Sequence, residues 1–112
     1  MANTTNPVFP FGAASKKTLA SAVTLAAGIN NTVTIIEVAL EIAATLNLTV
    51  DSETRVGSLL FVKVGSDGTA RNLTPGTGMT GTAVAGTINK TKVATYVYDG
   101  STFVHTGTQQ ID

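Results

Sequence analysis

Few side chains in this sequence could do chemistry, and those few lie far apart. His105 is the single histidine and the chain has no cysteine, so disulfides and thiolate ligands are excluded. No cluster of carboxylates lies near His105 in the sequence, although a metal site needs three or four ligands. One histidine also leaves the abundant serine and threonine hydroxyls with at most one general base. The residues therefore predict no metal site and no nucleophilic centre.

Two further patterns resemble catalytic motifs only at first sight. Glu37 and Glu41 would share one face of a strand roughly 13 Å apart, at about 3.3 Å per residue, which is too far for a glycosidase carboxylate pair. The glycine-rich stretch "PGTGMTG" (75–81) lacks the Gly-Lys-Ser/Thr that completes a phosphate-binding loop. We therefore expect a protein that is not an enzyme and that carries no cofactor.

The composition favours an all-β protein that associates with other molecules. Charged residues make up 12% of the 112 residues and the formal net charge is +0, against about 25% charged in a typical domain. Such a surface offers no basic footprint for nucleic acid or anionic lipid, and it gives little repulsion between copies. The 20 threonines are β-branched and favour strands.

The chain shows no targeting or membrane signal, so we expect neither export through the usual route nor insertion into a membrane. Its start, "MANTTNPVFPFGAASKK", has no basic region followed by an apolar stretch, as a signal peptide would. No segment reaches the roughly 18 consecutive apolar residues of a membrane helix.

The length predicts one domain. An extended arm is expected to precede it. Residues 1–16 form the predicted arm, because Pro7 and Pro10 disfavour helix in the residues before them. Val8, Phe9 and Phe11 would be costly to leave in water, so this arm should dock. Docking on its own domain and docking on a neighbouring subunit both remain open. Residues 17–112 form the predicted single β-sandwich domain.

Alternating apolar residues predict about eight short antiparallel strands in a β-sandwich of jelly-roll type. Their ranges are 18–25, 32–42, 45–50, 58–64, 69–74, 82–88, 92–98 and 102–106, with "GSDG" (65–68) as a hairpin turn. The segment 33–46 also contains good helix formers at helical spacing. Its strict period of two over residues 36–43 favours strand, and a helix remains the alternative.

The last hairpin carries the densest aromatic cluster. Tyr96, Tyr98 and Phe103 flank an Asp99-Gly100 turn, and cross-strand aromatic pairs contribute a few tenths to about 1 kcal/mol each. We interpret this cluster as a structural lock that fixes the register of the final strand.

The segment from 33 to 107 resembles the β-rich structural modules of tailed-bacteriophage virions. The resemblance rests on Gly57 and Phe61, the Asp67-Gly68 turn, the "YDG" of residues 98–100, and Phe103, which stands where the pattern usually has tryptophan. The nearest kinds are capsid decoration (cement) proteins and modules of head or tail fibres.

The resemblance implies a non-enzymatic structural protein, often a homotrimer, on the capsid exterior. Its partners would be the major capsid protein and further copies of itself, with Val8, Phe9 and Phe11 as the expected anchor to the capsid or to a neighbouring subunit. The alternative is a fibre or tail module that binds a receptor or glycan.

Overall fold

The computed structural model describes residues 14–112, which are all-β, with nine strands and no helix in that range. The predicted all-β class is confirmed. The predicted anchor, Val8, Phe9 and Phe11, lies outside the described residues. The strands are β2 (Ala14–Leu19), β3 (Thr24–Ile29), β4 (Val33–Leu40), β5 (Ala44–Val50), β6 (Leu59–Ser66), β7 (Leu73–Pro75), β8 (Met79–Thr80), β9 (Thr91–Tyr98) and β10 (Phe103–Gln110).

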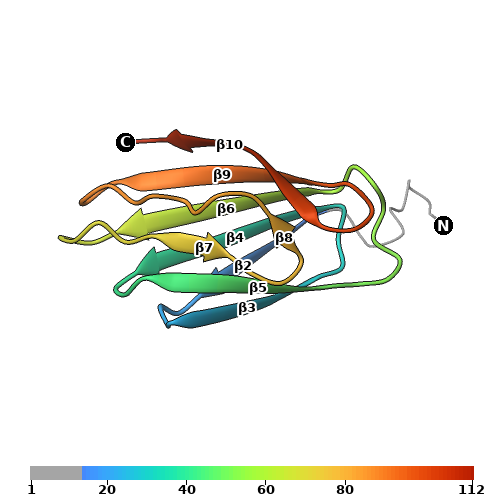
Figure 1. Ribbon diagram of the computed structural model, residues 1–112, viewed down its shortest axis with the longest axis horizontal. Helices are drawn as coiled ribbons and strands as arrows, with labels where there is room; N and C mark the ends of the chain where they lie inside the picture. The colour runs from blue at the N-terminus through green and yellow to red at the C-terminus, as the bar shows by residue number, and fades with distance from the viewer. Residues whose placement is uncertain (1–13) are drawn as a thin grey trace.

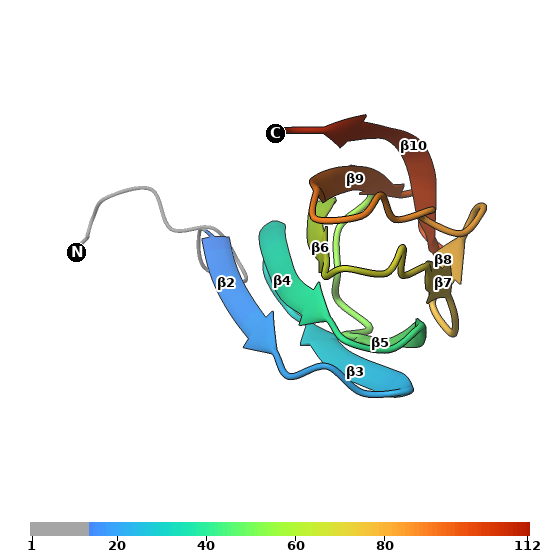
Figure 2. The ribbon, with the colours of Figure 1, turned by 90° about the vertical axis from the view of Figure 1, so that its left-hand side faces the viewer.

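The strands form two sheets that pack face to face, as a sandwich (Figures 1 and 2). The six-stranded sheet has the order β2-β4-β6-β9-β10-β8, and the three-stranded sheet has the order β3-β5-β7. From β2 to β7 the chain alternates between the two sheets at every connection, so it winds as a flat coil. The β9–β10 hairpin then extends the larger sheet.

This winding makes most neighbouring strands parallel, and the predicted antiparallel arrangement is wrong for them. β2, β4 and β6 pair in parallel, as do β3, β5 and β7. Among the described strands, only β6–β9 and β9–β10 pair antiparallel. Parallel strands need a crossover connection, and here the crossover is a strand of the opposite sheet. The jelly-roll part of the prediction is not confirmed.

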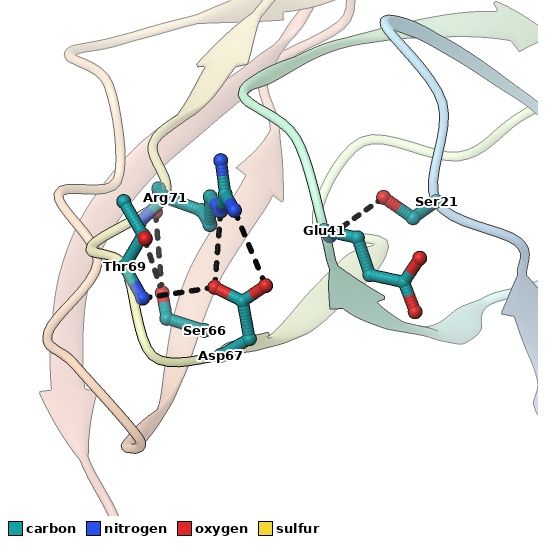
Figure 3. Close-up of polar contacts among 6 residues, drawn as sticks. All are labelled: Ser21, Glu41, Ser66, Asp67, Thr69 and Arg71. Carbon is teal, nitrogen blue, oxygen red and sulfur yellow. Dashed lines mark hydrogen bonds and ion pairs between the residues drawn. The ribbon is translucent and has the colours of Figure 1, made fainter.

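The "GSDG" turn illustrates the difference between prediction and structure. A hairpin there would pair residues 69–74 with β6, whereas β7 pairs with β5 in the other sheet. The connection is a β-arc, which joins strands of opposite sheets. The Asp67 carboxylate accepts a hydrogen bond from the Thr69 N–H at 3.0 Å and forms an ion pair with the Arg71 guanidinium at 3.0 Å (Figure 3). Between β4 and β5, the Glu41 N–H donates to Ser21 Oγ of the β2–β3 connection at 2.7 Å (Figure 3).

Several predicted strand boundaries are confirmed and two predicted strands are wrong. The segment 33–46 is strand rather than helix, since β4 and the start of β5 occupy it. Residues 18–25 instead span the end of β2, a connection and the start of β3. Residues 82–88 contribute one isolated bridge, from Val84 to Leu73.

The core lies between the sheets and follows the period of two. The buried side chains of β4 are Thr34, Ile36, Val38 and Leu40, and those of β5 are Ala44, Leu46 and Leu48. Burying one such aliphatic side chain contributes about 1.5–3 kcal/mol, so the alternating face is what stabilises each strand. The described part of the chain contains no apolar helix long enough to cross a membrane.

Gly76 is the point where the chain leaving β7 passes closest to β5. A Cβ at this position would lie 2.7 Å from the Leu46 carbonyl oxygen and would also collide with the Asn47 amide oxygen. We expect Gly76→Ala to lower the free energy of unfolding by about 1–3 kcal/mol, measured by urea denaturation. Gly107→Ala is the control, because its Cβ meets nothing within 4 Å. Equal midpoints for the two variants would contradict this packing.

Candidate interaction surface

The residues that could do chemistry are held in structural contacts. The His105 ring lies 5.0 Å from the Tyr96 ring, centroid to centroid, and its Nε2 is 2.7 Å from Thr108 Oγ1. Glu37 lies on β4, whereas Glu41 follows the end of that strand, so the two do not share a strand face. Within residues 14–112, no three histidine or carboxylate side chains are grouped so that they could hold a metal ion.

The β9–β10 hairpin forms as predicted around Asp99 and Gly100. The Asp99 carboxylate accepts hydrogen bonds from the N–H groups of Thr102 at 2.9 Å and Ser101 at 2.8 Å. These two bonds, to Thr102 and then Ser101, hold the pKa of the Asp99 carboxyl below its ordinary value of 3.8. Gly100 has a φ of 103°, a conformation that glycine adopts without steric cost.

The predicted aromatic cluster is divided into two pairs. Tyr98 and Phe103 lie directly opposite each other with ring centroids 5.0 Å apart, as the turn requires. Tyr96 pairs instead with His105, two residues further from the turn on each strand. The Tyr96 side chain is fully buried, and its burial raises the pKa of the phenol to about 12. Its hydroxyl has no hydrogen-bond partner within residues 14–112.

The outward faces of the two sheets differ strongly in polarity. The outward positions of the three-stranded sheet are small or polar: Thr24, Ala26, Gly28, Thr45, Asn47, Thr49 and Thr74. The outward positions of β4, β6, β9 and β10 carry seven half-buried apolar side chains, which we call the apolar face: Val33, Ile35, Leu59, Phe61, Val93, Val97 and Val104. Both faces belong to the same coil, so the difference comes from the sequence and not from the fold.

Strand register brings these apolar side chains together in rows across the sheet. Val33, Leu59, Val97 and Val104 occupy one row, and Ile35 and Phe61 lie side by side in the next. A shallow groove of about 550 Å³ runs beside them, between Phe61 and Val93 on one side and residues 106–109 with Ile111 on the other. The strand β10 has a register irregularity between His105 and Gly107, where its second half forms this wall.

An ion-pair ladder borders the apolar face. Glu37 lies between Lys16 and Lys63, with N–O distances of 3.5 Å and 3.4 Å. The hydrogen bond from Lys63 and the positive charge of Lys16 hold the Glu37 pKa below its ordinary value of 4.5. The three side chains are partly exposed, so the ladder contributes little to stability. It marks where the apolar face ends and the polar part of the sheet begins.

Reasoning from the sequence did not identify the apolar face. The signal was present in strand 58–64, where Leu59 and Phe61 alternate with Leu60 and Val62, so both faces of this strand are apolar. An antiparallel sandwich strand with one wet face would alternate apolar with polar residues instead.

Comparison with known families and curated proteins identified no relative of this chain. The sequence matches no protein-family model, and a search of curated proteins found no significant match.

The Tyr96 hydroxyl gives a direct test of the buried β9–β10 core. We expect Tyr96→Phe to raise the free energy of unfolding by about 1 kcal/mol, since it removes a buried polar group that has no partner among the described residues. The tyrosinate absorbance that develops near pH 12 should disappear in this variant. The Tyr96 phenol loses its proton at a lower pH in the unfolded chain than in the folded protein, so the wild-type protein should lose stability as the pH rises from 10 toward 12. Tyr96→Phe has no such group and should not show this loss. A destabilised Tyr96→Phe would mean that the hydroxyl has a partner.

The Asp99 carboxylate should make stability depend on acidity. Its folded pKa is lowered, so its contribution is complete above the ordinary value of 3.8 and is lost as the pH falls below that value. We expect Asp99→Asn, which keeps an acceptor oxygen but no charge, to have a lower urea midpoint at pH 7. The gap between the two proteins should close as the pH falls below 3.8. A gap of constant size would show that the charge contributes nothing.

Proposed function

We propose that this chain is a non-enzymatic structural protein of a bacteriophage virion, namely a capsid decoration protein. It would bind the outer surface of the shell formed by the major capsid protein and stabilise that shell. The observation that carries the proposal is the apolar face, because a soluble domain keeps so many aliphatic side chains outward only when a partner covers them. The resemblance of residues 33–107 to virion modules supplies the kind of assembly.

Decoration would work by adding buried area between capsid subunits. An interface of roughly 800 Å² per partner suffices for specific attachment, and shell symmetry repeats it many times. Residues 14–16 of the predicted arm belong to β2. The part of the arm that precedes β2, with Val8, Phe9 and Phe11 as its apolar anchor, would supply the capsid contact. A homotrimer would match a three-fold position of an icosahedral shell. The protein would be made in the host cytoplasm and would function on the capsid exterior.

The alternative is a fibre or tail module that binds a receptor or glycan. A second groove, of about 310 Å³, favours it because five of the eight residues that line the groove are polar: Thr82, Lys92, His105, Thr108 and Gln110. Glycan sites usually add an aromatic ring on which a sugar stacks, and the chain has no tryptophan. We therefore place decoration first.

Binding to empty capsid shells tests the proposal. We expect the wild-type protein to co-sediment with shells, and the triple variant Val8→Ser, Phe9→Ser and Phe11→Ser to bind at least about 100-fold more weakly, as for loss of an apolar hot spot. Thr49→Lys, on the polar outward face of β5, is the control and should bind as the wild type does. If the wild-type protein does not bind shells but binds a glycan on an array, the decoration proposal is wrong and the fibre function takes its place.

A further inference from the structure

We infer that the apolar face is the surface through which copies of this chain associate, with a second copy packed sheet against sheet. The inference deepens the assembly role proposed above, and it names both the surface and its occupant. The apolar side chains lie on four adjacent strands and form a continuous patch beside the Phe61 groove. The opposite outward face, on β3, β5 and β7, has no such patch.

The size of the face agrees with a contact between two copies. The five longer strands of the larger sheet, at about 4.8 Å spacing and with about eight residues at about 3.3 Å each, give roughly 600 Å² of outward face. Two such faces would bury about 1,200 Å², the lower limit for a specific interface. The apolar side chains cover only part of that area, so the contact must also use the aliphatic stems of Lys16 and Lys63.

The charges on the face favour another copy as the occupant and also restrict its orientation. The chain has a formal net charge of +0, so two copies do not repel each other. The ladder of Lys16, Glu37 and Lys63 carries a net positive charge on one side of the face. Copies stacked with their ladders superposed would bring like charges together. A symmetric arrangement that overlaps the apolar side chains buries the aliphatic stems of Lys16 and Lys63 at the rim and leaves the charged ends of the ladder in water.

Sheet-on-sheet packing is also the geometry that such a face permits. Two sheets pack about 10 Å apart with their strands near-aligned, and their side chains interdigitate. The row of Val33, Leu59, Val97 and Val104 consists of aliphatic side chains that suit this packing. Association would therefore be driven by apolar burial, and its strength should change little with salt.

The first measurement is the solution mass of the wild-type full chain by sedimentation equilibrium, from low to several hundred micromolar. We expect a dimer whose population grows with concentration and is insensitive to salt. Phe61→Lys should weaken this association at least about 100-fold, because it places a charge within the apolar patch. Thr49→Lys is the matched control on the other sheet and should associate as the wild type does. Circular dichroism and thermal melting verify that both variants are folded.

A second readout remains valid if Phe61→Lys does not fold. The chain has no cysteine, so a spin label attaches only at an introduced one. Thr95 is half-buried on β9 beside Phe61 in the register. Labels on Thr95→Cys should approach within roughly 20 Å across the interface and broaden each other's spectrum, whereas labels on Thr49→Cys should not.

The outcomes separate this inference from the decoration function. A wild-type protein that stays monomeric overturns the inference, as does a folded Phe61→Lys that associates normally or the absence of broadening at Thr95. If such a monomer binds shells, decoration still stands while the apolar face is not an interface between copies. An oligomer that uses this face but does not bind shells supports the inference and removes the decoration function.

Discussion

The structure depends on one constraint: each strand from β3 to β7 has apolar side chains on one face that must be buried, and the chain buries them by crossing to the opposite sheet at each connection. Strands of opposite sheets then cover each other's inward side chains. A strand and the next one in the same sheet run the same way, which makes these neighbours parallel. Hydrogen bonding along each sheet follows from this winding, because the partner strand lies one full turn of the coil away.

The β9–β10 hairpin interrupts the winding and fixes its end. Both strands remain in the larger sheet and run antiparallel, so β6 acquires a neighbour without a further turn of the coil. Asp99 binds the backbone of the turn, while Phe103 and Tyr96 fill the core below it. The aromatic residues of the hairpin thus complete the hydrophobic core. They also hold β9 and β10 in the larger sheet, whose outward side carries the apolar face.

The contrast between the two outward faces links the fold to the proposed assembly. Parallel sheets usually carry apolar residues on both faces because something covers each face. The three-stranded sheet departs from this with threonine and asparagine outward, whereas the larger sheet follows it with valine, isoleucine, leucine and phenylalanine. A chain with 12% charged residues has few charged groups whose repulsion would keep two such surfaces apart. The composition and the apolar face therefore both support the association of copies that we propose.

The sequence alone determined the class of fold, the strands of residues 33–50 and the final hairpin, because each depends on local information. A period of two marks a half-buried strand, and an Asp-Gly turn between aromatic residues marks a hairpin. Only the tertiary structure decided which sheet contains the strand that follows the Asp67 turn. The same Asp-Gly turn can join two strands of one sheet or two strands of opposite sheets. The same uncertainty hid the apolar face. Phe61 and Val97 lie far apart in the chain, and only the antiparallel register of β6 with β9 places their outward side chains on the same surface.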